Sequence, residues 1–362
     1  MQVMRVGLAA AAMFAAMPAF AQTGYVPPKA GDGHPDLQGV WSTDSITTLE
    51  RSDRYKTLVI PPDQVEALTR AHPQVVRQAT DDNQKTSDGL LNGKDLAQGR
   101  GYNAFWIDPG TRFGVVKGET RTSWIVDPPN GKIPWSEQGR KLAKEGREKL
   151  GYSDPEARPL ADRCLATGGR TGPPMINGLY NNHYQIVQTK DAVMIMSEMI
   201  TWARIVRMDQ PHNPNAIHPL FGDAVGHWDG GALVVETTGF APVRAMQAVP
   251  ANLSESAKVT ERFTRVSATE LLYEFTVDDP VFYTQPWKGE TTWRSEGEAV
   301  YEYACHEGNY AMEGILKGAR VREAKSLPVR RATASVGRRR RPPPCNALIH
   351  CAVVAPLWRF SP

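Results

Sequence analysis

The stretch GHWDGGALVVETTGF, residues 226–240, decides the fold because it joins a hairpin turn to a strand of unusual composition. The Asp-Gly-Gly triplet at 229–231 favours the positive φ angles of a tight hairpin. Residues 233–237 are rich in β-branched side chains and contain one charge, Glu236. A charge in an apolar strand must be solvated, paired or part of a lined cavity. We therefore expect an antiparallel β-barrel or sandwich with a polar interior.

From Asn181 onward, apolar and polar residues alternate with a period of two, as in half-buried strands. Short turns join successive strands, and no helical pattern separates them, which favours an antiparallel meander over a parallel, doubly wound sheet. The sequence thus predicts a mainly β fold, an antiparallel up-and-down β-barrel of the lipocalin-like kind. The expected strands are residues 184–188, 193–198, 203–208, 233–237, 259–266 and 271–277.

The segment before residue 161 has a different composition, rich in Gly, Pro and Asp. It contains a few expected elements: strands at 39–42 and 123–127, a helix after Pro62, and a helix over 136–150 capped by Ser136 and stopped by Gly151. We expect this irregular, partly helical N-terminal region, residues 22–160, to wrap the barrel or close one of its ends. The barrel domain itself is expected over residues 161–323.

The first 21 residues read as a signal peptide. Arg5 precedes an apolar run over residues 6–20, and Ala19-Phe20-Ala21 fits a small-x-small cleavage site. The alternative, a short membrane anchor, is disfavoured because the run is shorter than the ~20 residues that a span requires. We expect a periplasmic or secreted protein with no membrane span after signal cleavage.

Residues 324–362 differ from the rest of the chain by their Arg, Pro and Ala runs. Of the 42 Lys and Arg residues, eight lie in this tail, which leaves 34 against 39 acidic residues and a net charge of −5 in the remainder. That balance argues against nucleic acid as a partner. A basic tail for an anionic surface is one interpretation. We favour an out-of-frame or disordered tail that contributes no core strand.

Two of the four cysteines, Cys164 and Cys305, lie outside the tail. In an exported protein they favour a disulfide that closes a long loop and adds roughly 4 kcal/mol of stability. The alternative is a free thiol beside His306. Their spacing gives no zinc signature, and the irregular set His212, His218 and His227 is only a weak indication of metal binding.

Several long motifs resemble those of a family of exported bacterial hypothetical proteins with the patterns YNNxYQI, GHWxGxxLVVET and YEYACHEGNY. The matching segments are YNNHYQI (180–186), GD (222–223), GHWDGGALVVETT (226–238), TERFTR (260–265), VDDP (277–280) and YEYACHEGNY (301–310). The likeness spans most of residues 34–323. The resemblance implies an exported, soluble β protein that ends soon after a segment like 314–323. It does not imply any particular activity.

The candidates for chemistry lie in or beside the expected strands. If alternate strand positions face a lumen, an interior charge network forms from Glu198, Arg204, Glu236 and Glu274, in which His183, His227 and His306 act as general acid or base. We expect one cavity to be surrounded by His183, Glu198, Arg204, His227 and Glu236, with His306 at its rim. The predicted catalytic residues are His183, His227, Glu236, His306 and Glu307. The predicted ligand-binding residues are Asn181, Asn182, Tyr184, Glu198, Arg204 and Trp228, with Trp228 and Tyr184 stacking on a ring.

Structural interpretations compete with each of these roles. Glu236 and Arg204 form a cross-strand ion pair in one of them, and Asn181 and Asn182 form a left-handed turn in another. The sequence contains no Gly-x-Ser-x-Gly elbow, P-loop, dinucleotide fingerprint or His-Glu-x-x-His motif, and no cofactor and no metal are expected. Two functions remain: a cofactor-independent lyase, isomerase or hydrolase acting on a small ring-containing compound, or a periplasmic binding or carrier protein for such a ligand. The sequence does not fix the oligomeric state.

Overall fold

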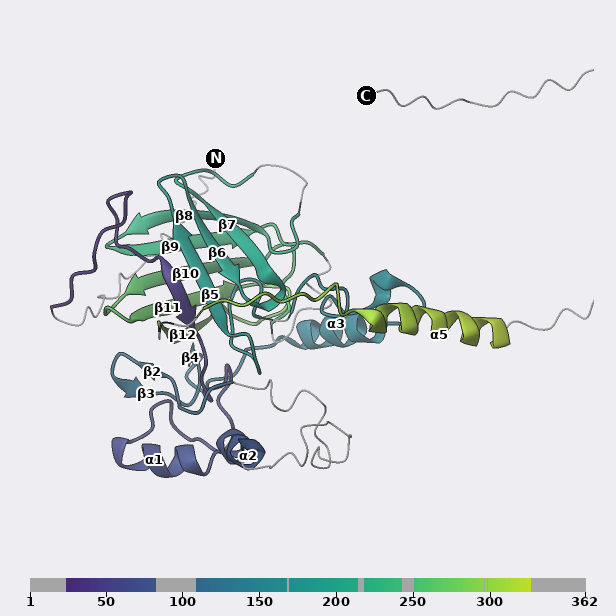
Figure 1. The fold of residues 1–362 in the computed structure, drawn as a ribbon, viewed down its shortest axis with the longest axis horizontal. Coiled ribbons are helices and arrows are strands. Elements are labelled where there is room, and N and C mark those ends of the chain that lie inside the picture. The colour runs from purple at the N-terminus through teal and green to yellow at the C-terminus, as the bar shows by residue number, and fades with distance from the viewer. Residues whose placement is uncertain are drawn as a thin grey trace, which may run out of the picture. The chain divides into compact units, whose positions relative to one another are not determined.

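A closed, nine-stranded β-barrel dominates the computed structural model, which describes residues 24–82, 109–167, 169–213, 218–242, 251–295, 297 and 299–326 (Figure 1). The mainly β, lipocalin-like barrel predicted from the sequence is thus confirmed. Its strands are β1 (Gly39–Ser42), β5 (His183–Gln188), β6 (Ala192–Ser197), β7 (Trp202–Met208), β8 (Asp223–Asp229), β9 (Ala232–Thr238), β10 (Lys258–Arg265), β11 (Glu270–Asp278) and β12 (Trp287–Arg294).

The barrel closes through β1, which comes from the N-terminal region. Ser42 pairs with His183 of β5 on one side and with Arg294 of β12 on the other. A short strand, β4 (Ile125–Asp127), pairs with the far end of β12. The N-terminal region therefore supplies barrel strands as well as covering structure.

One strand pair departs from the expected antiparallel meander. β7 and β8 are parallel, with Arg207 opposite Val225 and Met208 opposite Gly226. Parallel neighbours cannot be joined by a two-residue hairpin, so a longer connection, of which residues 209–213 and 218–222 are described, separates β7 from β8. The hairpin between β8 and β9 is as predicted, because Gly230 and Gly231 adopt φ angles of 54° and 83°.

Aromatic rings fill much of the barrel interior. Tyr184 stacks on Trp293 with ring centroids 4.6 Å apart, and Tyr273 lies 5.0 Å from both Trp293 and Phe263. Trp41 and these four side chains are at most 1% exposed. Burial of such large rings is a major source of stability. The interior is thus a packed core into which a small polar network is set.

Residues 171–176, which we call the plug, are all buried and join this core through Met175 and Ile176. The Met175 backbone N–H donates to the Tyr273 hydroxyl at 2.9 Å. Upstream of the plug, Cys164 forms a disulfide with Cys305, as the sequence predicted.

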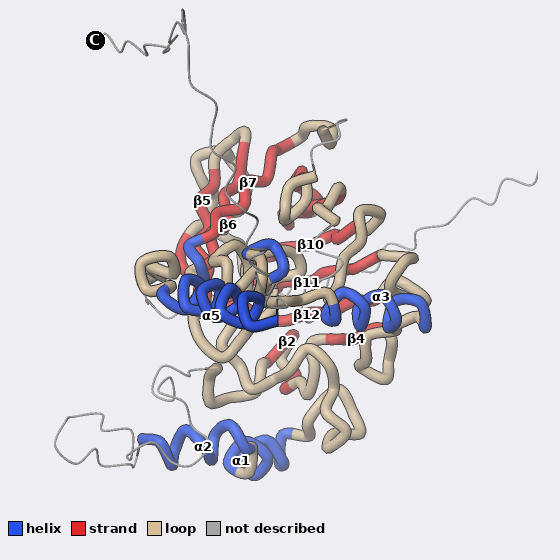
Figure 2. The backbone as a smooth tube through the Cα atoms, turned by 90° about the vertical axis from the view of Figure 1, so that its right-hand side faces the viewer, coloured by secondary structure: helices blue, strands red, loops and turns tan. Residues whose placement is uncertain are grey.

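The helices lie outside the barrel strands, and α1 and α2 are neighbours (Figure 2). The predicted cap of α3 is confirmed, since Ser136 Oγ accepts the Gly139 N–H at 2.8 Å. The helices are α1 (Pro62–Arg70), α2 (Pro73–Asp82), α3 (Glu137–Glu148) and α5 (Tyr310–Ser326), with single turns η2 (Pro155–Ala157) and η3 (Met199–Thr201) and a small hairpin of β2 (Val115–Val116) and β3 (Glu119–Thr120).

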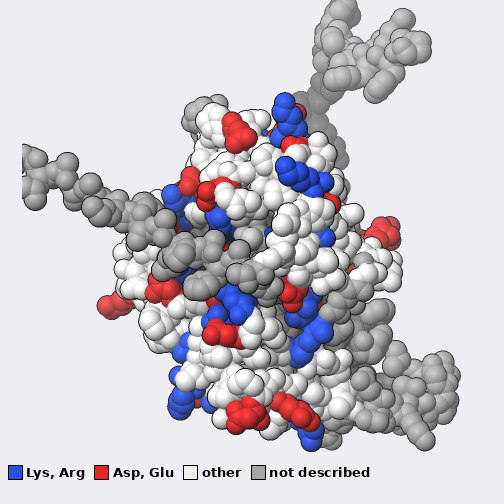
Figure 3. Space-filling model, turned by 90° about the vertical axis from the view of Figure 1, so that its left-hand side faces the viewer, with Lys and Arg blue, Asp and Glu red and all other residues white. Residues whose placement is uncertain are grey.

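The chain divides into a compact unit, residues 1–320, and a second unit, residues 321–362, of which only the end of α5 is described. The predicted signal peptide and most of the predicted tail lie outside the described residues. Within the described ranges, no helix is long and apolar enough to cross a membrane. On the face in Figure 3, Lys and Arg side chains are interspersed with Asp and Glu rather than gathered in one patch.

Candidate functional site

His183 and Glu198 form a histidine–carboxylate pair at the β5–β6 end of the barrel. His183 begins β5, Glu198 follows β6, and the Glu198 backbone N–H donates to the His183 carbonyl at 2.9 Å. Their side chains meet with Nδ1 of His183 2.9 Å from Oε2 of Glu198. The imidazole is 22% exposed and the carboxylate only 3%. The antiparallel pairing of β5 and β6 thus holds the partly exposed imidazole of His183 against the buried carboxylate of Glu198.

The Glu198 carboxylate is held in its charged form. Burial raises the pKa of Glu198, but the hydrogen bond to His183, the Tyr301 backbone N–H at 3.2 Å and the Asn181 side chain outweigh it and leave the pKa below its ordinary value. An ionised carboxylate at Nδ1 favours the tautomer in which Nδ1 carries a proton. In that neutral tautomer the lone pair of the ring lies on Nε2.

Two asparagines shape the turn that leads into β5. Asn181 has a left-handed φ of 54°, which this residue type tolerates. The Asn182 side chain accepts the Gly178 N–H at 2.7 Å and donates to the Gly178 carbonyl at 3.1 Å. Both predicted ligand-binding asparagines therefore stabilise the backbone that carries His183.

Two aromatic side chains with exposed surface belong to chain segments that adjoin Glu198. Tyr301, whose N–H binds Glu198, is 71% exposed, and Trp202 at the start of β7 is 36% exposed. One face of Trp202 contacts Phe221 at a centroid distance of 4.6 Å. These rings were not singled out from the sequence, although each lies within four residues of a predicted site residue.

A second polar network lies inside the barrel. Arg204 Nη2 is 2.7 Å from Glu261 Oε2, and the Tyr273 hydroxyl donates to Glu261 Oε1 at 2.7 Å. Arg204 and Glu261 are 6% and 0% exposed. The sequence placed Arg204 in the interior correctly, but its partner is Glu261 and not Glu236. The Tyr184 hydroxyl donates to the Arg170 carbonyl at 3.0 Å in the same interior.

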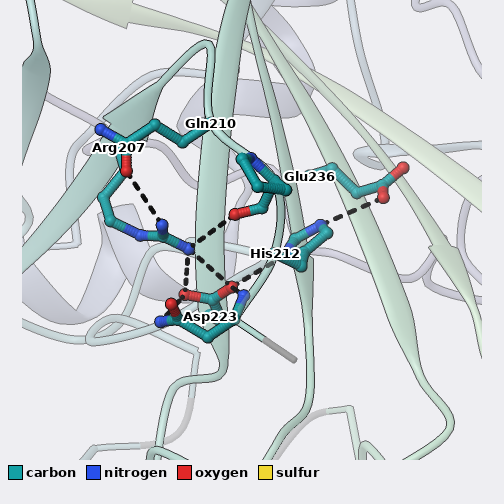
Figure 4. A network of polar contacts seen from close by, with 7 residues as sticks. Arg207, Gln210, His212, Asp223 and Glu236 are labelled. Carbon is teal, nitrogen blue, oxygen red and sulfur yellow. Dashed lines mark hydrogen bonds and ion pairs between the residues drawn. The ribbon is translucent and has the colours of Figure 1, made fainter. Parts of the chain in front are cut away.

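Glu236 lies on the outer face of β9, because its neighbours Val235 and Thr237 face the core. It contacts Lys258 Nζ at 3.0 Å and His212 Nε2 at 3.2 Å. His212 Nδ1 is in turn 2.9 Å from Asp223 Oδ2, so that the imidazole lies between two carboxylates (Figure 4).

Asp223 is the centre of this outer network. Both of its oxygens lie 2.9 Å from Arg207 Nη2, and it also accepts from the Asn213 backbone N–H at 2.9 Å and the Asn213 side chain at 3.1 Å. With His212 these contacts occupy the acceptor positions of the carboxylate. The network therefore pins the start of the β7–β8 crossover to β8 and has a structural role.

The remaining predicted residues lie apart from His183. His227 is exposed on β8, and Trp228 is stacked on His34 at 4.7 Å, which covers one face of its ring. His306 and Glu307 are exposed in the segment that follows Tyr301. The expectation of one interior cavity for His183, Glu198, Arg204, His227 and Glu236 is wrong, because Glu236 and His227 face outward.

Among the described residues, no group of three or more His, Cys, Asp or Glu side chains is arranged to hold a metal ion. Comparison of the chain with protein families, curated proteins and solved structures gave no match. The function must therefore be argued from the residues themselves.

Proposed function

We propose that the protein is an exported, cofactor-independent enzyme that transfers protons on a small ring-containing compound, with His183 as its general acid and base. The observation that supports this most is the 2.9 Å contact between His183 Nδ1 and the buried carboxylate of Glu198. In many enzymes that use acid–base or nucleophilic catalysis, the base is held in position by a second group in this way. The reaction class is that of a lyase, an isomerase or a hydrolase.

In this mechanism His183 Nε2 accepts a proton from the substrate or from a water molecule. The positive imidazolium that results is stabilised by Glu198 at Nδ1, and the proton then returns to the product. Glu198 does not itself exchange protons, because its lowered pKa keeps it ionised. It is a positioning residue, fixed in turn by the Tyr301 N–H.

The substrate class is inferred from the aromatic ring beside the His183–Glu198 pair. Tyr301, whose backbone N–H binds Glu198, offers exposed aromatic surface beside the pair, and a small ring stacks on such surface with little loss of conformational entropy. Tyr184 and Trp228, the stacking residues expected from the sequence, are engaged with Trp293 and His34. We therefore assign the stacking role to Tyr301.

The test is proton exchange on a library of small lactones, esters and cyclic ketones in deuterated water, followed by mass spectrometry. The wild-type protein should convert or deuterate at least one compound, and His183→Asn should reduce that rate by at least about 100-fold. Glu198→Gln should reduce it less and shift its pH profile, whereas His218→Asn, a half-exposed histidine outside the pair, should leave it unchanged.

Two results would contradict the proposal that the protein is an enzyme. Full turnover by His183→Asn would remove His183 from the mechanism. Saturable binding of a library compound without any conversion or exchange would support the alternative function, a binding or carrier protein in which the same groups only orient a ligand.

A further inference from the structure

The buried guanidinium of Arg204 and the half-buried guanidinium of Arg170 both act on the Tyr184 hydroxyl in the barrel interior. Arg204 is paired with Glu261, and the backbone carbonyl of Arg170 holds the Tyr184 hydroxyl. Burial raises the pKa of Tyr184, on which Arg170 and Arg204 act as positive charges and Glu261 as a negative one. Glu261 pairs with Arg204, whereas the Arg170 guanidinium lies over the Tyr180 ring at 5.2 Å and has no carboxylate partner among the described residues, so its positive charge is uncompensated.

Several hydrogen-bonding atoms of this region are buried and have no partner among the described residues. They include Arg204 Nε and Nη1, Arg170 Nε and Ser197 Oγ. Ser197 lies opposite Tyr184 in the β5–β6 ladder, and Arg204 lies opposite Ile195, two residues away on the same face of β6. Each buried donor left unpaired costs about 1–3 kcal/mol, and more when it is charged. A bound group that accepts these hydrogen bonds would remove that cost.

We propose that this part of the barrel interior binds a small organic carboxylate, held by Arg204 and Arg170 beside the Tyr184 hydroxyl. A planar guanidinium matches the two oxygens of a carboxylate, whereas water would leave the positive charge uncompensated. One monoanion balances the charges of the site.

The plug, residues 171–176, is joined to this site by a chain of contacts. Met175 binds the Tyr273 hydroxyl, Tyr273 binds Glu261, and Glu261 binds Arg204, so the plug and the site belong to one chain of contacts. Gly172 lies directly against the Phe221 ring.

Sodium benzoate is the probe, with benzamide as its neutral match, and both are added to the full, oxidised chain. Benzoate should raise the thermal midpoint in a saturable manner and change the tryptophan fluorescence, because Trp293 stacks on Tyr184. Benzamide should do neither. No saturable effect of benzoate, or an equal effect of benzamide, would overturn the site.

Matched variants locate the binding. Arg204→Gln and Arg170→Gln should each weaken benzoate binding by at least roughly tenfold, the equivalent of one charge-assisted hydrogen bond. Arg262→Gln, which removes an exposed ion pair with Asp229, should leave it unchanged. Arg170 is only half-buried, so Arg170→Gln tests the proposed site even if Arg204→Gln fails to fold. Unchanged benzoate affinity in Arg170→Gln refutes the proposal. His183→Asn should keep full benzoate binding, which separates this site from the proposed catalytic pair.

Discussion

Asp223 shows how one buried carboxylate can fix a crossover. Its oxygens accept hydrogen bonds from Arg207, His212 and Asn213. Burial raises the pKa of Asp223, but the Asn213 amide, His212 and Arg207 outweigh it and hold the pKa below its ordinary value of 3.8. The stability that this carboxylate contributes is therefore complete above that value and is lost as the pH falls through the lower, folded-state pKa.

We expect Asp223→Asn to lower the free energy of unfolding by about 1.5–3 kcal/mol near neutral pH, because it weakens charge-assisted hydrogen bonds. The difference between variant and wild type should shrink in acid, where the wild-type carboxylate becomes protonated. Denaturant unfolding near neutral pH and well below pH 3.8 measures both effects. Asp229→Asn, which removes an exposed carboxylate, is the control, and an equal loss in both variants would contradict the prediction.

Residue parity explains why the sequence identified one interior charge and misplaced another. Arg204 shares its strand face with the buried Val206 and Met208, so its interior position was predictable. Glu236 alternates with Val235 and Thr237, and the same parity assigns it to the outer face. Glu261, between Val259 and Phe263, also has the interior parity, so the alternation of the strand expected over 259–266 places its carboxylate in the core.

Strands with one solvent-exposed face were predictable from the alternation of apolar and polar residues. Strand β12 lacks such a face and was not predicted. Its residues are buried on both faces, so Thr, Glu and Gly interrupt the apolar pattern without marking a loop. The outer face of β12 carries Glu290, which pairs with Lys117 and Arg121 from the β2–β3 segment. Such burial by distant segments leaves no period-two signal in the local sequence.

The Cys164–Cys305 disulfide should act on the plug more than on the barrel. It closes a separation of 141 residues, so replacement of both cysteines by serine should cost about 4–5 kcal/mol of unfolding free energy in the chain-entropy model. Hydrogen exchange should quicken at the Met175 amide, while the amide of Val235 in β9 serves as the internal reference. Exchange that quickens equally at both positions would show that the disulfide does not hold the plug specifically.

Closure of the barrel is a property of the whole chain that local patterns do not encode. Ser42 and Arg294 pair across most of the sequence, and Arg294 Nη2 also donates to the Asp44 carbonyl at 3.0 Å. The strand at 39–42 was predicted, but its place beside β12 was not, because periodicity identifies strands and not their partners. For the same reason the His183–Glu198 contact required the β5–β6 register to be known.

A chain that ends after Ser326 should match the full chain in thermal midpoint within error. Along α5 only Ala319 is buried, and the described core residues lie before it. A chain that ends before residue 299 is the control, because it loses both Tyr301, which binds Glu198, and Cys305, which binds Cys164. Calorimetry of the three chains checks this. If removal of residues 327–362 abolished cooperative unfolding, the tail would be part of the folded unit, and the interpretation of it as out-of-frame or disordered sequence would be wrong.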